Sequence, residues 1–129
     1  MKYMLMMHSP ANVAEALSKW SPADFKGHIE YMIALYKQLT ASGELVLAEG
    51  LAMPHEAKLV TAKQAGKPLV SDGPFAESKE FLAGFWIVKV PSAQRAYEIA
   101  SIASVAPGPG GAPMGIPIEV RAVGEAPQV

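Results

Sequence analysis

Short apolar runs alternate with two longer segments of helical periodicity along the chain. Residues 3–7 form a continuous apolar run that ends at Ser9 and Pro10, a pattern typical of a buried central strand. A short helical turn is expected within residues 11–20. Further apolar segments bounded by turn residues predict strands at residues 44–51, 58–61, 84–90 and 118–123. We expect the 44–51 and 58–61 strands to pair antiparallel across the short connection between them.

The first helical segment has a full set of N-terminal signals. Ser21 is an N-cap residue, Pro22 follows at the first helical position and Asp24 lies three residues after the cap. Gly43 supplies a stop, so the sequence predicts a helix over residues 22–42. Its apolar residues recur at steps of three and four and predict one buried stripe, made of Phe25, Ile29, Met32, Leu35, Tyr36 and Leu39.

Ser92 caps the second helical segment, which ends near Ser104. We expect one face of it to be buried against the sheet, namely Ala93, Ala96, Tyr97, Ala100 and Ala103. The order of elements predicts a single α+β domain over residues 1–129, a plait with one mainly antiparallel sheet and both main helices on one face. Because the strands are apolar on both sides, the uncovered face predicts a homodimer whose sheets pack face to face.

Composition narrows the classes of partner and compartment. The 129 residues include no cysteine, which excludes a disulfide framework, a thiolate metal site and a cysteine nucleophile, and suits a reducing cytoplasm. The formal net charge is −1, so no direct contact with nucleic acid is expected. No apolar run approaches the roughly 18 residues of a membrane-spanning helix, and the N-terminal run is too short for a signal peptide. The sequence therefore predicts a soluble cytoplasmic protein without membrane association.

His28 is the first candidate for chemistry. It follows Phe25 by three residues, which places it on or beside the buried stripe of the first helix. One interpretation is structural, a histidine at the edge of the core whose ring is satisfied by a backbone carbonyl. The other is catalytic: a neighbouring carboxylate, for which Asp72 is the candidate, fixes the imidazole tautomer and makes His28 a general base or acid near neutral pH.

Asp72 also has two interpretations. The residues 69–71 lead into Asp72-Gly73, a standard turn in which the aspartate side chain hydrogen-bonds locally. Pro74 removes a donor where a tight hairpin needs one, which favours a wider turn and a more accessible Asp72. An exposed loop on a rigid sheet is a common place for a functional site.

Several further side chains are secondary candidates. Phe75, Glu77 and Lys79 are candidate ligand contacts, with core packing for Phe75 and a solvated charge cluster for the other two as the structural alternatives. His8 shares a side of its strand with the methionines there, so it either lines the same cavity or faces solvent. The histidine spacings do not preorganise a zinc site, and no metal or redox cofactor is expected. Residues 107–117, rich in proline and glycine, are expected to gate or wall a pocket.

The turn belongs to a longer motif. Asp72-Gly73-Pro74-Phe75, followed by Ala76-Glu77-Ser78-Lys79-Glu80 and Gly84-Phe85, resembles the signature of the DGPF group within the YCII-related proteins, relatives of the dimeric α+β barrel superfamily. The similarity extends over nearly the whole chain, through Ser21-Pro22, His28, Ser42-Gly43-Glu44-Leu45 and Ile118-Glu119-Val120-Arg121.

The resemblance implies a ferredoxin-like plait that dimerises through its sheet faces, and a pocket in which His28 and Asp72 form a dyad. Most members of the group have no assigned reaction. A relative in the wider group is similar to a lyase that removes chloride from a chlorinated aromatic ring. Some DGPF members accompany extracytoplasmic-function sigma factors, which implies a regulatory setting.

Two hypotheses of function follow. The first is a small-molecule-binding protein, a cofactor-independent lyase or isomerase, in which His28 oriented by Asp72 moves a proton of an organic substrate. The alternative is a non-catalytic, metabolite-sensing or regulatory module associated with an extracytoplasmic-function sigma factor. Activity that survives His28→Ala contradicts the first hypothesis, whereas co-purification with a partner protein favours the second.

Overall fold

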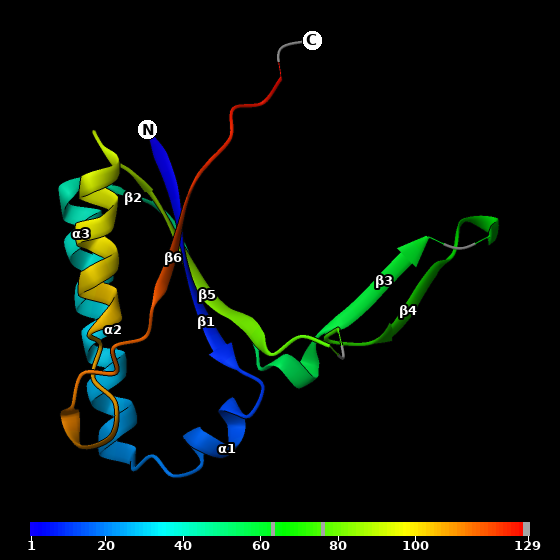
Figure 1. Cartoon of the computed structure of the whole chain (residues 1–129), viewed down its shortest axis with the longest axis horizontal. Helices are drawn as coiled ribbons and strands as arrows, with labels where there is room; N and C mark the ends of the chain where they lie inside the picture. Colours follow the sequence, from blue (N-terminus) through cyan, green and yellow to red (C-terminus); the bar gives the residue numbers. More distant parts are fainter. Residues whose placement is uncertain (63, 76, 128–129) are drawn as a thin grey trace.

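The chain folds into a layer of helices packed on a four-stranded sheet (Figure 1). A computed structural model describes residues 1–62, 64–75 and 77–127. The strands are β1 (Lys2–Pro10), β2 (Leu45–Gly50), β3 (Lys58–Ala62), β4 (Pro68–Asp72), β5 (Glu80–Lys89) and β6 (Ile118–Ala122). The helices are α1 (Val13–Leu17), α2 (Pro22–Ser42) and α3 (Ala93–Ser104), with 3₁₀ turns η1 (Pro54–Glu56), η2 (Gln64–Gly66) and η3 (Pro109–Gly111).

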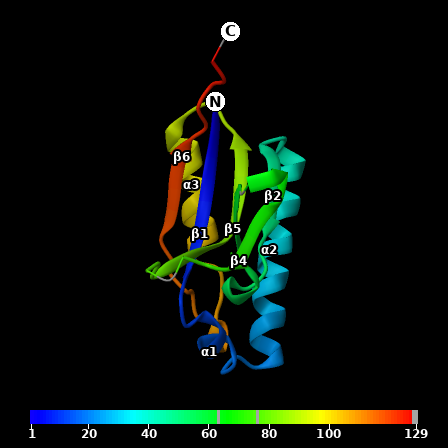
Figure 2. The ribbon, with the colours of Figure 1, turned by 90° about the vertical axis from the view of Figure 1, so that its right-hand side faces the viewer.

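The main sheet has the strand order β2-β5-β1-β6, and each neighbouring pair is antiparallel. Helices α2 and α3 cover one face of this sheet (Figure 1), and Figure 2 shows the other face, which the helices leave open. The predicted α+β plait, with its main helices on one face of a mainly antiparallel sheet, is therefore confirmed. Within the described part of the chain, none of the helices combines the length and apolarity needed to cross a membrane.

Strands β3 and β4 form a separate hairpin that projects away from the helices (Figure 1). The predicted pairing of residues 44–51 with 58–61 is therefore wrong, because β2 pairs with β5 and β3 pairs with β4. The apolar pattern located both strands. It could not identify their partners, because pairing is decided by register and packing across the whole sheet.

The core lies between the sheet and the two long helices. Leu5 of β1 and Val88 of β5 are fully buried, and they pack with Ile99 of α3 and with Leu35 and Leu39 of α2. Because side chains alternate along a strand, burial of these positions turns the intervening residues to the open face. The β1–β5 register brings four of those residues together in two cross-strand pairs, Met4 with Ile87 and Met6 with Phe85.

Helix α2 buries less of its predicted stripe than expected, whereas α3 buries Ala96, Ala100 and Ala103 as predicted. The predicted stripe of α2 is buried at Leu35 and Leu39, but Ile29 is 52% exposed and Tyr36 is 50% exposed. Phe25 is exposed as well. On α3, the predicted Tyr97 is exposed to solvent. Ile99, which was not predicted, is buried in its place. The periodicity of α2 identifies the side of the helix that faces the sheet. Part of that side does not contact the sheet, because an open groove separates α2 from β2 and β5.

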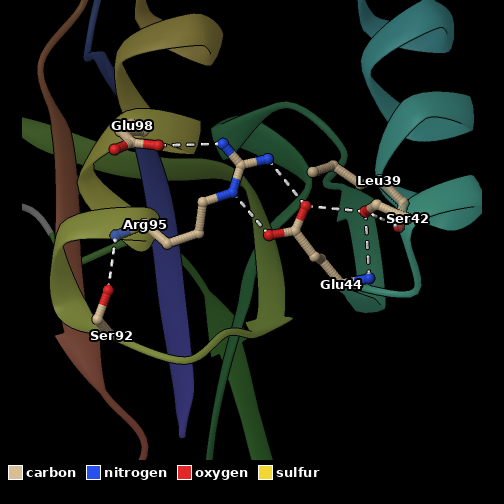
Figure 3. A network of polar contacts seen from close by, with 6 residues as sticks. All are labelled: Leu39, Ser42, Glu44, Ser92, Arg95 and Glu98. Atoms are coloured by element: carbon tan, nitrogen blue, oxygen red, sulfur yellow. Dashed lines mark hydrogen bonds and ion pairs between the residues drawn. The ribbon is translucent and has the colours of Figure 1, made fainter.

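A charged network ties the end of α2 to the start of α3 (Figure 3). Arg95 donates from Nε and Nη2 to the two carboxylate oxygens of Glu44 at 2.7 and 2.9 Å, and from Nη1 to Glu98 at 3.1 Å. The Ser42 hydroxyl donates to Glu44 at 2.8 Å. The hydrogen bonds from Arg95, more than that from Ser42, lower the pKa of the Glu44 carboxyl to about 2.

Arg95→Met should lower the free energy of unfolding by about 1–2 kcal/mol at neutral pH, because it removes a two-point hydrogen bond to a carboxylate. The pKa of Glu44 is lower in the folded chain than its ordinary 4.5. Its stabilising contribution is therefore present above pH 4.5 and is lost as the pH falls toward about 2. Denaturant unfolding across this pH range should show that the difference in free energy of unfolding between the parent and Arg95→Met becomes smaller in acid.

Lys26→Met is the control for this experiment. Lys26 and Glu30 form an exposed pair at 3.8 Å, so its loss should change the free energy of unfolding by less than about 0.5 kcal/mol. An Arg95→Met deficit that is the same in acid as at neutral pH contradicts the assigned role of Glu44.

Candidate functional site

A groove of about 470 Å³ opens between α2 and the β2–β5 side of the sheet. Its helix wall is mostly apolar and contains Ile29, Met32, Ile33 and Tyr36, with His28 beside them. Its sheet wall includes small residues of β2 and β5, namely Ala48, Gly50, Ala83 and Gly84. Apolar lining with a few polar groups is typical of a small-molecule site.

Two facing glycines create the groove. The β2–β5 register places Gly50 opposite Gly84, and alternation from the buried Trp86 puts both on the helix side of the sheet. Neither strand has a side chain at this level, so the space beneath α2 stays empty of protein. A Cβ on Gly84 would lie 3.0 Å from the carbonyl oxygen of Glu49, whereas one on Gly50 would meet no atom within 4 Å. Gly84 therefore permits close strand contact, and Gly50 keeps the groove open.

His28 is held at the groove by a backbone carbonyl. Its Nδ1 lies 3.0 Å from the carbonyl oxygen of Pro107, and Trp20 packs edge-on against the ring with centroids 5.6 Å apart. A carbonyl oxygen can only accept a hydrogen bond, so Nδ1 carries the proton. In the neutral ring, Nε2 is then the nitrogen with a free lone pair. The carbonyl partner agrees with the structural interpretation of His28, while its place in the groove wall leaves it able to accept a proton.

The loop that supplies this carbonyl is fastened to the start of α2. Asp24 accepts from the main-chain N–H of Gly110 at 3.0 Å and from that of Ser21 at 3.0 Å, the second bond being part of the helix capping box. These bonds, first that from Ser21 and then that from Gly110, lower the pKa of the Asp24 carboxyl. The turn next to Pro107 is therefore fixed against α2 and supports His28.

Asp72 lies on the projecting hairpin. It is the last residue of β4, and its carboxylate accepts from Nζ of Lys58 on β3 at 2.7 Å. Its side chain is 91% exposed, and the hairpin and α2 lie on opposite sides of the sheet (Figure 1). Among the described residues, the hydrogen-bond partners of His28 and Asp72 are thus Pro107 and Lys58. The structure does not bring the two predicted dyad members together within one chain, and a catalytic role for Asp72 stays a prediction.

The Asp72-Gly73-Pro74-Phe75 motif forms the root of this hairpin. The N–H of Gly73 donates to the carbonyl oxygen of Ala57 at 2.9 Å. A Cβ on Gly73 would lie only 3.2 Å from that oxygen, so glycine allows the close approach. The motif therefore has a structural role in joining the hairpin to the chain that precedes it.

The secondary candidates are scattered. Phe75, Glu77 and Lys79 are exposed near the hairpin, so their roles in ligand binding stay predictions, and Ala76 of the motif lies outside the described residues. Across the part of the chain that the structure describes, no group of three or more histidine, aspartate or glutamate side chains is arranged to hold a metal ion.

His8 forms a pair that sequence reasoning missed. Its Nε2 lies 3.0 Å from Oε1 of Glu119 across β1 and β6. Strand alternation places His8 on the open face with Met4 and Met6, so the sheet separates it from the groove. Polar residues on β6 were visible in the sequence, but only the β1–β6 register could identify Glu119 as the partner.

Comparisons with known proteins agree with the expected family. The family model described as the YCII-related domain matches residues 1–106, a span that includes every residue lining the groove. A protein of Rhizobium meliloti (strain 1021), described as uncharacterised, is 29% identical over 100 residues, which cover 78% of this chain and 77% of that protein. These similarities support the fold and give no specific reaction.

Long-range ¹H–¹⁵N NMR should show neutral His28 protonated at Nδ1, because only that nitrogen lies against the Pro107 carbonyl. His55 is exposed on η1 and serves as the internal comparison, with the Nε2-protonated form that predominates in a solvent-exposed histidine side chain. Asp24→Asn should move His28 toward the pattern of His55, because the amide replaces one of the two oxygens that hold the Ser21 and Gly110 N–H groups. A spectrum with His28 protonated at Nε2 contradicts the tautomer assignment.

Proposed function

Because the chain belongs to the YCII-related domain family, we propose that it binds a small organic molecule in the groove and that His28 moves a proton of this molecule. One observation carries the proposal, the 3.0 Å contact between Nδ1 of His28 and the carbonyl oxygen of Pro107. This contact leaves Nε2 as a base in a mostly apolar groove of about 470 Å³. A cofactor-independent lyase or isomerase needs a positioned base of this kind.

The chemistry uses the chain's own residues. Nε2 of His28 takes a proton from a carbon of the substrate, and the electron pair left on carbon forms a double bond. In an elimination a leaving group departs with its bonding electrons, and in an isomerisation His28 returns the proton to another atom. The Pro107 carbonyl accepts from Nδ1 throughout, so it stabilises the imidazolium that forms.

Metabolite sensing without chemistry is the second candidate. His28 and Tyr36 are the polar side chains along the helix wall of the groove, and they lie eight residues, or about 12 Å, apart on α2. His28 alone is sufficient to hydrogen-bond a ligand, and Tyr36 lies too far away to assist it in a proton transfer. This interpretation predicts binding that does not lead to turnover.

We also propose that two copies pack through their open sheet faces. Met4, Phe85 and Ile87, all half-buried, surround the buried Met6 and give that face an apolar centre, and an apolar sheet face is typical of an interface. The β3–β4 hairpin projects from the same side of the sheet (Figures 1 and 2), where it would flank a second copy. The groove lies on the helix side, so this arrangement leaves it accessible.

The neutral probe 5-nitrobenzisoxazole tests the proposed base. Removal of its C3 proton by a base forms a nitrile, breaks the N–O bond and releases a coloured phenolate. We expect the protein to accelerate this reaction and His28→Gln to lower the rate by about 100-fold, the usual contribution of a positioned base.

His55→Gln is the matched control, because His55 is exposed and lies outside the groove. It should leave the rate unchanged. If His28→Gln and His55→Gln retain the same rate as the parent, His28 is not the base.

Ile87→Lys should convert the proposed dimer to a monomer in sedimentation velocity, because it places a charge in the apolar centre of the open face. Val105→Lys changes an exposed apolar residue at the end of α3 and should leave the mass unchanged. A parent chain that sediments as a monomer, or an Ile87→Lys variant that remains dimeric, contradicts the proposed interface.

A further inference from the structure

The charge of the groove restricts what it can bind. Glu49 contributes the formal negative charge among the residues that line it, but the β2–β5 register places Glu49 opposite Phe85. Both therefore turn their side chains to the open face and line the groove with main chain. No lysine or arginine is among the described lining residues. An anion that entered the groove would lose hydration without gaining a fixed cationic partner.

The lining of the groove favours a ligand with an apolar main portion. Ile29 and Ile33 on α2 are about half exposed, and they face the bare main chain at the Gly50–Gly84 pair. A ligand lying over this pair would remove those side chains from water at the level where the sheet has no side chains of its own. The volume of about 470 Å³ lies within the range of small-molecule sites, roughly 300–1,000 Å³.

We propose that the groove binds a neutral, predominantly apolar molecule and that Gly50 is the residue that admits its body. This inference rests on the proposed use of the groove as a small-molecule site and adds the chemical class of the ligand. The apolar body lies over the Gly50–Gly84 pair between the sheet and α2. The group that exchanges a proton is placed at His28, the titratable imidazole of the wall.

Two fluorescent probes with the same skeleton test the ligand class. N-phenyl-1-naphthylamine is neutral, and 8-anilinonaphthalene-1-sulfonate carries one added sulfonate. Both gain fluorescence on leaving water. We expect the neutral probe to bind saturably and the sulfonate to bind at least about tenfold more weakly, because the groove offers no fixed cation to compensate for desolvation.

The Gly50→Val variant tests whether the neutral probe binds in the groove. Its Cβ meets no atom within 4 Å, so the variant should fold while filling the groove, and we expect it to weaken binding of the neutral probe by at least about tenfold. Gly124→Val is the matched control, because a Cβ there also meets no atom within 4 Å and Gly124 lies outside the groove. Ile33→Gln is a second groove variant at an exposed helix position, and it should also weaken binding. Circular dichroism and thermal unfolding verify that each variant is folded.

Equal affinity for the two probes overturns the ligand class. So does binding of the neutral probe that Gly50→Val and Ile33→Gln leave unchanged, because the probe then lies elsewhere. The binding assay and the 5-nitrobenzisoxazole assay together separate this inference from the proposed chemistry. If 5-nitrobenzisoxazole does not react but the binding results hold, the chemistry fails and the ligand class stands. If His28-dependent turnover is found but the sulfonate binds equally well, the ligand class fails and the chemistry stands.

Discussion

Burial of Leu5 and Val88 between the sheet and the helices is the constraint on which the rest of the structure depends. A slip of one residue in either strand would exchange its two faces, so the core fixes the register of β1 against β5. The same alternation of side chains then determines which residues lie at the groove and which lie on the open face of the sheet. It places Gly84 under α2, where the groove opens, and it places Ile87 on the open face.

The groove is possible because α2 is fastened at both ends. At its start, Ser21 and Asp24 form a capping box, and Asp24 also holds the Gly110 turn. At its end, Gly43 adopts a left-handed φ of 78° and Glu44 follows with its bonds to Arg95 (Figure 3). A helix fixed in this way can keep its middle turns away from full contact with the sheet. The exposed apolar residues there, Ile29, Ile33 and Tyr36, are a local loss of burial along the wall of the groove.

Local signals in the sequence predicted the elements well, and long-range geometry accounts for what they missed. The cap at Ser21 and the stop at Gly43 set the bounds of α2 because both act within one turn of the chain. The pairing of β2 and the facing of Gly50 with Gly84 depend on register between distant segments, which a single sequence does not contain. His28 could be chosen from its helix position. Its partner could not, because a main-chain carbonyl is present at every residue and leaves no sequence signal.

The identity of that partner matters for the chemistry of His28. Asp72 lies at the root of the β3–β4 hairpin, where its register partner is Lys58. Among the described residues, the hydrogen-bond partner of His28 is instead the carbonyl oxygen of Pro107. A carbonyl stabilises an imidazolium less than a carboxylate does, because the hydrogen bond lacks a full negative charge. It also carries no ionisable proton, so the Pro107 carbonyl can accept from Nδ1–H of both the neutral ring and the imidazolium.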